Sequence, residues 1–373
     1  MSNNSPLVVD FPTNEEIYVK IGHKVARDLF ESTGEKQFTI GVLSCNYYSF
    51  TFSMDINTSK GHKHIFVKIP KAHMRGTSPK ILPITTEDRV LAKDEETSLR
   101  FLSDKWDGIK QEVSWVKIYG IVPEYNAIVT KQVFATDVIN IFRRIDKKRR
   151  FGLKKDLSRL ESIMKRLGGS IGHFHQANSK TSIFKLSDEL QKIKYYCQEL
   201  CSVTGSIWPE RIMQKLQSMK DMEIETTKLP TFKGIDIRNV LIDYNDSLFI
   251  LDPGKTKLAF REIDLARLIS TYQLLHWGSF WLILLRKPHS YAESVFMNAY
   301  CEEGQDVSHR LLNLYLLKEY LKHWHNIIDY VEKTKWPRII KKLVLLIYIN
   351  PFFSYLLKDE WSNLLKYNNF DKM

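Results

Sequence analysis

The chain has 373 residues, of which 43% are hydrophobic and 26% are charged, and it carries a net charge of +12. These values are ordinary for a soluble globular protein with room for two domains or one two-lobed domain, and no repeat or low-complexity tract stands out. The positive charge favours anionic partners such as nucleotides, phosphorylated sugars or acidic lipids, and it argues against a polycationic substrate. No nucleic-acid module is recognisable, so nucleic acid is not a predicted partner.

Cysteine usage and the N-terminal sequence bear on the compartment. The four cysteines contain no C-x-x-C pair, which favours ordinary reduced thiols. The opening MSNNSPLVVDFP lacks the charged start and apolar core of a signal peptide. We therefore expect a cytoplasmic protein.

The first part of the chain has the alternation that is typical of strands, with one helix. Residues 38–56 predict two antiparallel strands, and residues 62–71 predict a third that ends at a proline. Residues 85–106 have leucines at helical spacing, with Thr85 or Thr86 as the cap. Residues 115–133 predict two more strands. The expected order is strand, strand, strand, helix, strand, strand.

After residue 133 the pattern changes to helical periodicity. Residues 157–178 predict one helix, and residues 187–222 predict two, broken between Gly205 and Pro209. Residues 231–255 predict a short hairpin, and nearly everything from residue 261 onward predicts helix. The predicted fold class is α+β, with a small β-rich lobe and a larger helical lobe. The predicted divisions are an extension at 1–34, an N-lobe at 35–133 and a C-lobe at 134–373.

Short motifs that suit phosphate and metal chemistry follow one another along the chain. They are Lys68 in IFVKIP, Glu95 opening E-x-x-x-L-x-x-L, Asn239 in RNVLI, Asp252 in LDPGK and Asp264 in REIDLARLI. A lysine that ends an apolar strand can pack its stem inside while its ammonium enters a cleft. Carboxylate and amide oxygens are ligands that Mg²⁺ prefers.

This ordered set resembles the protein-kinase-like fold, and most closely its aminoglycoside and choline phosphotransferase branch, over roughly residues 35–275. The resemblance implies ATP and Mg²⁺ as cofactors. Lys68, fixed by Glu95, would grip the α- and β-phosphates, and Asn239 and Asp252 would bind the metal. Asp264 would brace the catalytic loop through backbone amides. The histidines of GHFHQA, His173 and His175, would be structural.

Three further assignments follow from the resemblance with less support from residue type. Glu96 is a rival to Glu95 as the partner of Lys68. The loop GVLSCNYYSF has a single glycine, so Ser44 and Asn46, together with backbone amides, would contact the phosphates. Residues 129–133 fall where the family joins its lobes and binds the adenine edge.

The sequence departs from the family at the catalytic base. The family's loop reads roughly H-G-D-x-x-x-x-N, and counting back from Asn239 puts Gly234 at the aspartate. Asp236 lies two residues further on and is the provisional base, with Gly234 allowing an unusual backbone there. Two alternatives stay open: Asp236 as a further metal ligand, or a pseudokinase that acts as a nucleotide-binding or protein-interaction module.

The acceptor is expected to be a hydroxyl of a sugar or small molecule, including a lipid-linked one. The basic segment 142–156 and the apolar segments 277–285 and 341–357 suggest peripheral contact with an anionic membrane at its inner face. Neither apolar segment reaches the length of about 20 residues that spans a bilayer. Solvated loops and ordinary core helices are the simpler interpretation of these segments.

Overall fold

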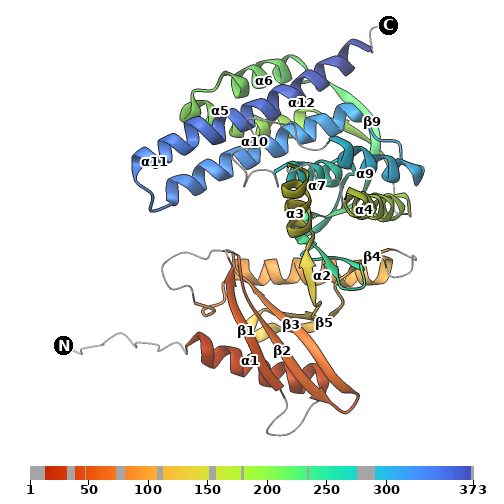
Figure 1. The fold of residues 1–373 in the computed structure, drawn as a ribbon, viewed down its shortest axis with the longest axis vertical. Helices are drawn as coiled ribbons and strands as arrows, with labels where there is room; N and C mark the ends of the chain where they lie inside the picture. The colour runs from red at the N-terminus through yellow and green to blue at the C-terminus, as the bar shows by residue number, and fades with distance from the viewer. Residues whose placement is uncertain are drawn as a thin grey trace, which may run out of the picture. The chain divides into compact units, whose positions relative to one another are not determined.

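The computed structural model describes residues 13–31, 38–46, 48–72, 80–106, 112–150, 157–177, 180–232, 235–274 and 290–370. The chain forms two compact units (Figure 1). The first comprises Met1–Ala135 and Ile242–Thr256, and the second comprises Thr136–Leu241 and Lys257–Met373. The boundaries between them fall within β7 (Ala135–Asp137), β10 (Val240–Asp243) and β12 (Thr256–Phe260).

The first unit is built on a five-stranded sheet of order β1-β2-β3-β6-β5. Its strands are β1 (Phe38–Asn46), β2 (Ser49–Thr58), β3 (Gly61–Pro70), β5 (Ile118–Val122) and β6 (Ala127–Lys131), with η1 (Pro123–Tyr125) between the last two. Neighbouring strands are antiparallel. The alternation of apolar residues therefore gives the sheet one apolar face and one mixed face.

Helix α1 (Asn14–Phe30) covers the apolar face. Its Ile17, Ile21 and Val25 are buried in one cluster with side chains of β2 and β3 such as Phe52 and Val67. A capping box between Thr13 and Glu16 begins the helix. Residues 14–30 were predicted to lie within an extension, yet they supply a helix that completes this core.

Helix α2 (Thr86–Trp106) packs on the other face of the sheet, where Ala92 and Leu99 meet Ile128 of β6. Of the two predicted caps, Thr85 is the one used. Its Oγ1 accepts from the Asp88 amide at 3.1 Å, and the Asp88 carboxylate accepts from the Thr85 amide at 2.9 Å. Beyond α2, the short strands β4 (Val113–Trp115) and β11 (Leu248–Ile250) pair in parallel.

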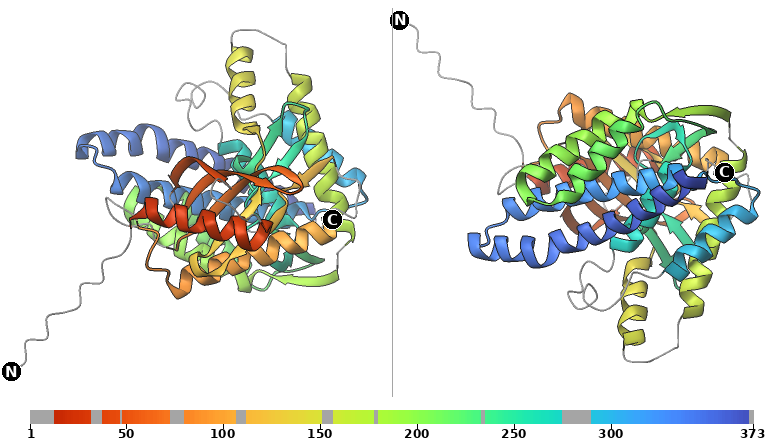
Figure 2. Two further views of the ribbon diagram at one scale, coloured as in Figure 1. Left: turned by 90° about the horizontal axis from the view of Figure 1, so that it is seen from below. Right: turned by 90° about the horizontal axis from the view of Figure 1, so that it is seen from above.

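The second unit is mainly helical. Its elements, besides those that cross a boundary, are α3 (Val138–Arg150), α4 (Leu157–Ala177), β8 (Lys180–Lys185), α5 (Ser187–Thr204), α6 (Ile207–Ser218), β9 (Glu223–Phe232), η2 (Ile237–Asn239), α7 (Glu262–Leu274), α9 (Ser290–Glu302), α10 (His309–Lys333), α11 (Arg338–Leu343), the π-helical η4 (Val344–Ile349) and α12 (Asn350–Phe370). Helices α10 and α12 run side by side, as the two views of Figure 2 also show. Strands β12, β9 and β8 form a small sheet.

The α+β fold class is confirmed by the sheet of the first unit and the helices of the second. Helices α4, α5 and α6 lie where periodicity predicted them. Strands β8 and β9 were not predicted. The apolar segment 277–285 lies outside the described residues, as does Gly234.

Among the residues that the structure describes, one helical stretch, Arg338–Leu364, is long and apolar enough to cross a membrane by length and composition. Only 22% of its most apolar window is buried, less than a core helix of a soluble protein would show. By itself a single such stretch is weak support for a membrane span.

Candidate functional site

Lys68 lies on the mixed face of the sheet in the first unit. Its neighbours Val67 and Ile69 on β3 point into the core, so strand alternation directs Lys68 to the face on which α2 packs. Its ammonium donates to Glu95 Oε1 at 2.9 Å and to Asp252 Oδ1 at 2.9 Å. The three side chains make a triad of one cation and two carboxylates.

The charge of Lys68 is held by this triad. Burial alone would lower the pKa of Lys68, but the carboxylates of Glu95 and Asp252 raise it overall. The lysine side chain is 20% exposed and that of Glu95 is 10% exposed, so water screens their attraction weakly. Lys68 is therefore held in its charged form between two carboxylates.

The geometry also shows which of Glu95 and Glu96 contacts Lys68. Glu96 forms ion pairs along its own helix, with Lys93 at 3.3 Å and Arg100 at 3.0 Å. Glu95 is one residue earlier, and that 100° rotation turns it toward β3 instead. Within the described residues, Glu95 is the α2 glutamate that bonds to Lys68.

Asp252 belongs to a tight loop that is anchored to α2. Its backbone is left-handed, with φ of 51°, and Gly254 two residues later is also left-handed, with φ of 62°. The Thr256 amide donates to Ser98 Oγ at 2.8 Å, and Lys255 pairs with Asp94 at 3.2 Å. Helix α2 thus holds Glu95 and the loop that carries Asp252. Aspartate is one of the residues that adopt this backbone most readily, as Asp246 also does with φ of 61°.

The predicted phosphate loop is a strand hairpin. Ser44 on β1 is exposed and pairs with Thr51 on β2, and the backbone of Asn46 pairs with that of Ser49. The side chain of Asn46 lies outside the described residues. In the predicted linker, the Gln132 amide donates to the His64 carbonyl. The phosphate role of Ser44 and the adenine role of the linker stay predictions.

In the second unit, Asp264 braces the start of the predicted catalytic loop. Both of its carboxylate oxygens accept from the Phe232 amide, at 3.0 and 3.1 Å. His175 Nε2 lies 3.4 Å from Asp264, and His175 Nδ1 is 2.8 Å from the Tyr300 hydroxyl. These buried contacts are consistent with the structural roles predicted for Asp264 and His175.

Asp236 is held by arginine. Its Oδ1 accepts from the Arg238 amide and from Arg238 Nε, both at 2.9 Å, and Arg267 Nη2 lies 3.5 Å from Oδ2. The Asp236 side chain is 4% exposed. Burial alone would raise the pKa of Asp236, but Arg238 holds it below its usual range. A carboxylate in this setting stays ionised and takes up a proton reluctantly, which is unfavourable for a general base.

The charges around Asp236 extend to α10. Arg267 on α7 donates to Glu319 Oε2 at 3.0 Å, and Glu319 also accepts from Lys322. Sequence reasoning did not find this network. Arg238, directly before Asn239, was the one local signal, because a basic residue beside a buried aspartate is its natural partner. Arg267 and Glu319 are too distant in sequence to have been found.

Asn239 ends the short η2 helix, and its amide donates to the Asp236 carbonyl at 2.8 Å. The loop from Asp236 to Asn239 is therefore closed by both side-chain and backbone bonds. Asn239 belongs to the second unit and Asp252 to the first. Their joint metal role stays a prediction from sequence, as does the effect of Gly234.

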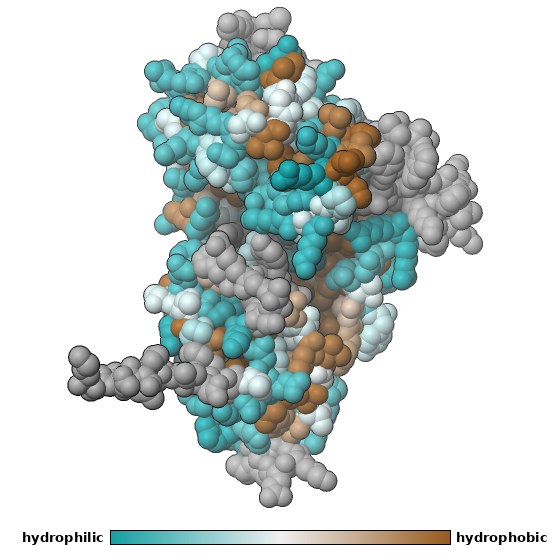
Figure 3. Space-filling model, turned by 90° about the vertical axis from the view of Figure 1, so that its left-hand side faces the viewer, coloured by the Kyte–Doolittle hydropathy of each residue, from teal (hydrophilic) through white to brown (hydrophobic). Residues whose placement is uncertain are grey.

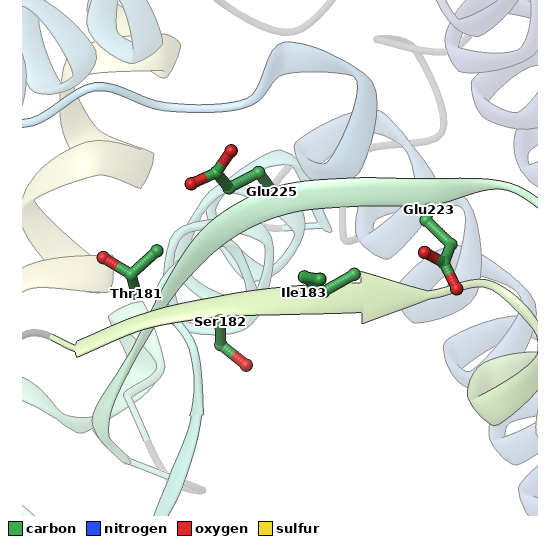
Figure 4. A pocket seen from close by; sticks show the side chains of 5 residues that line it. All are labelled: Thr181, Ser182, Ile183, Glu223 and Glu225. Carbon is green, nitrogen blue, oxygen red and sulfur yellow. The ribbon is translucent and has the colours of Figure 1, made fainter.

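A hollow on the second unit lies elsewhere. It is lined by Thr181, Ser182 and Ile183 of β8 and by Glu223 and Glu225 of β9 (Figure 4). None of the predicted site residues lines it. It is an open surface between two strands, and two of its side chains are acidic, so it does not suit a phosphate-bearing ligand.

Solved structures share this fold. A glucosamine kinase in complex with glucosamine, ADP and inorganic phosphate matches with a TM-score of 0.56 and 11% identity, over 97% of this chain and 88% of that chain. A choline kinase from Cryptosporidium parvum Iowa II matches with a TM-score of 0.53 and 12% identity, over 95% and 97%. An ADP-bound aminoglycoside phosphotransferase matches with a TM-score of 0.51 and 12% identity, over 90% and 98%.

No protein-family model matches the chain, and no curated protein sequence matches it significantly. At 11–12% identity the structural likeness establishes the fold. The kinase-like fold predicted from the order of motifs is therefore confirmed, with nearly full coverage of both this chain and the structures it matches.

Proposed function

We propose that this protein is a phosphotransferase that moves the γ-phosphoryl group of ATP to a hydroxyl of a sugar or another small molecule, including a lipid-linked one. The observation that carries the proposal is the triad of Lys68, Glu95 and Asp252. An ammonium has three N–H donors, and two of those on Lys68 go to these carboxylates. The third can go to a phosphate oxygen, with Glu95 fixing the lysine during binding.

The fold supports the same proposal. Two of the matched structures contain ADP and all three are kinases or phosphotransferases of small molecules. In such reactions the protein contributes mainly positioning and electrostatic stabilisation. A half-buried lysine whose charge is stabilised by two carboxylates, one of them on α2, is suited to that task.

The predicted metal ligands fit Mg²⁺ by chemistry. Asp252 offers a half-exposed carboxylate on a loop held by α2, and Asn239 offers an amide oxygen at the end of η2. Bound Mg²⁺ would neutralise charge on the phosphates. In the proposal Asp252 serves both Lys68 and the metal, with one oxygen for each.

Asp236 is kept as the proposed base, on the condition that its pairing with Arg238 opens when the acceptor binds. The alternative is a pseudokinase that binds nucleotide without transfer. Two observations favour that alternative: Gly234 stands at the family's aspartate position, and Asp236 is occupied by arginine contacts.

The acceptor in this proposal carries negative charge. Arg238, Arg267 and Lys322 lie in the network around Asp236 and Glu319, so three cations face two carboxylates. This local excess has the same sign as the net charge of the chain. A phosphorylated or acidic hydroxyl compound would meet complementary charge there.

Peripheral membrane contact is also part of the proposal. The exposed apolar side chains of Trp336, Ile339, Ile340, Leu343, Leu346 and Ile347 form what we term the α11 face. Residues 333–350 contain five basic and no acidic residues (Lys333, Lys335, Arg338, Lys341, Lys342). Figure 3, coloured by hydropathy, looks onto the end of the second unit where α11 lies and shows hydrophobic and hydrophilic side chains next to one another. Such a surface suits the interface of an anionic membrane.

The test of the nucleotide site is a thermal-shift titration with ATP, with and without Mg²⁺. A ligand that binds the folded state raises the melting temperature. We expect a Mg²⁺-dependent rise in the wild type that is lost in Lys68→Ala and Asp252→Ala. Lys255→Ala is the matched control, because Lys255 lies on the same loop but pairs with Asp94.

The outcomes separate the two functions. No shift at millimolar ATP in the wild type would rule out the nucleotide site. A shift without ADP formation across a panel of hydroxyl acceptors would favour the pseudokinase. ADP formation with an acceptor, reduced about 10²-fold or more in Asp236→Asn, would support Asp236 as the base.

A further inference from the structure

A second group of ligand-type side chains lies at the far end of the β2–β3 hairpin from Lys68. Asp55 on β2 is directly opposite His64 on β3, and Asn57 is directly opposite His62. His62 and His64 are two residues apart, so strand alternation puts both rings on the same face. The hairpin register therefore gathers two imidazoles, a carboxylate and an amide in one place.

The candidate ligand atoms converge. His64 Nδ1 lies 2.5 Å from Asp55 Oδ1, and His62 Nε2 lies 3.8 Å from the same oxygen. One ligand atom from each of Asp55, His62 and His64 lies within 4.8 Å of the others. Metal bonds of about 2.0–2.1 Å in tetrahedral geometry separate ligand atoms by roughly 3.3 Å. Small side-chain rotations would bring all three atoms to that spacing, and the metal would displace the proton that His64 Nδ1 and Asp55 Oδ1 share.

The hydrogen bond of His62 sets its ring in the state that a metal needs. His62 Nδ1 is 2.9 Å from Asn57 Oδ1. An amide oxygen only accepts, so Nδ1 carries the proton and Nε2 is the acceptor nitrogen of the neutral ring. That nitrogen is the one that faces Asp55. Such an outer contact that orients a histidine is usual at metal sites.

We propose that Asp55, His62 and His64 bind a divalent transition-metal ion of the class that prefers imidazole, with Zn²⁺ as the representative. Two nitrogens and one carboxylate oxygen suit Zn²⁺, Co²⁺ or Ni²⁺ better than Mg²⁺. The three side chains are 43–46% exposed, so the ion can enter from solvent and water can complete its coordination. This site shares no residue with the proposed ATP site and does not depend on it.

The position of the site gives the ion a structural consequence. His64 and Lys68 lie on the same face of β3, four residues apart. The His64 carbonyl accepts from the Gln132 amide after β6, and the ring of Phe134 meets that of His64 edge-on at 5.0 Å. An ion bound here would cross-link β2 to β3 beside the segment that comes after β6.

The test is a calorimetric titration of the tag-free, chelator-treated full chain with ZnCl₂, repeated with CoCl₂. We expect one ion per chain in the wild type, and binding weakened about tenfold or more in His62→Ala, His64→Ala and Asp55→Ala. His173→Ala is the matched control, because His173 is 44% exposed and also lies beside a carboxylate, that of Glu303 at 3.3 Å. Lower pH should weaken binding, since protons compete for the imidazole nitrogens.

Several results would overturn the proposal. They are the absence of stoichiometric binding in the wild type, equal loss of affinity in His173→Ala, or a Co²⁺ spectrum with thiolate charge transfer, which would point to a cysteine such as the exposed Cys45. The melting temperature of each variant without metal is measured alongside. Because the three side chains are on the surface, these substitutions should leave it nearly unchanged.

Discussion

Asp252 combines an unfavourable backbone with a well-placed carboxylate. Its φ of 51° costs a non-glycine residue about 1–2 kcal/mol. The ion pair with Lys68 offsets little of this free-energy cost. The Asp252 side chain is 50% exposed, and such pairs contribute about 0–1 kcal/mol. Asp252 therefore adds little to the stability of the fold, and glycine would suit its backbone at least as well.

We predict that Asp252→Gly keeps or raises the melting temperature while it abolishes the Mg²⁺-dependent ATP shift. Glycine adopts positive φ without penalty, but it has no metal ligand. Thermal unfolding with and without MgATP measures both effects on one sample. An ATP shift that survives in Asp252→Gly would show that the carboxylate is not a ligand.

Asp236 should contribute stability with a definite pH dependence. Arg238 holds the pKa of Asp236 below its ordinary value of 3.8. A lowered folded-state pKa gives stability that is fully present above the unfolded value and is lost as pH falls below it. The contribution should therefore be constant from pH 7 down to about pH 5 and decline below pH 4.

We predict that Asp236→Asn lowers the free energy of unfolding at pH 7 by about 1–3 kcal/mol, because Arg238 and Arg267 lose their charged acceptor. The difference in the free energy of unfolding between wild type and variant should be smaller at pH 3.5. Urea unfolding at pH 7, 5 and 3.5 measures it. A gap that is the same at all three values would mean that the Arg238 pair does not stabilise the fold.

At the scale of elements, the contact of α4 with α9 requires glycine at position 168 of α4. A Cβ added at Gly168 would lie 2.2 Å from the Phe296 carbonyl oxygen, which is a backbone atom of α9. At Gly169 the nearest atom would be 3.8 Å away. A side chain is therefore excluded at Gly168 and tolerated at Gly169, although both glycines lie in the interior of a helix.

We predict that Gly168→Ala lowers the free energy of unfolding by about 1–3 kcal/mol through overpacking. Gly169→Ala should raise it by about 0.5–1 kcal/mol through helix propensity. Chemical denaturation of the two variants against the wild type gives both values. Equal effects of the two substitutions would contradict the close approach of α9.

Local pattern predicted the elements whose periodicity is strong, such as α4, α5 and the strands β1 to β3. It missed α1, although Thr13 and Glu16 form a capping box and Ile17, Ile21 and Val25 have helical spacing. These residues precede the stretch 35–275 that resembles the family, so the prediction left them in an extension. Sequence favoured Glu95 over its neighbour Glu96 because Glu95 opens the pattern E-x-x-x-L-x-x-L, and the contact with Lys68 agrees with that choice.

The buried network around Asp236 could not be predicted from the sequence, for a different reason. Arg267 and Glu319 come from α7 and α10, and only tertiary packing brings them near the loop. The same holds for the metal-type group of Asp55 and His64, which depends on hairpin register. Pairing across elements is set by how surfaces fit, and one sequence contains no direct record of it.

At the scale of the whole molecule, the α11 face should govern partition to lipid. Because its apolar residues are exposed and its flanks basic, we predict that the protein sediments with vesicles containing phosphatidylglycerol and not with pure phosphatidylcholine. Ile339→Gln and Leu346→Gln, at residues that are 73% and 69% exposed, should each weaken binding about tenfold.

Val203→Gln is the control for that prediction, because Val203 is a 55% exposed apolar residue on α5 in the same unit. Added salt should weaken vesicle binding through screening of the basic residues. Equal sedimentation with both vesicle types would contradict the prediction. An equal loss of binding in Val203→Gln and Leu346→Gln would show that the α11 face is not the membrane contact.

The segment Ile242–Thr256 belongs to the first unit although it comes late in the chain, and this order affects folding during synthesis. Strand β11 lies beside β4, and Asp252 bonds to a lysine 184 positions earlier. A nascent chain that has just passed Ala135 therefore lacks a strand and a charge partner, and it must wait until Thr256 has been synthesised. During that interval the edge of β4 is open to wrong pairing. A truncation at the first boundary would fix the chain in that unfinished state, so the smallest piece that completes the first unit ends at Thr256.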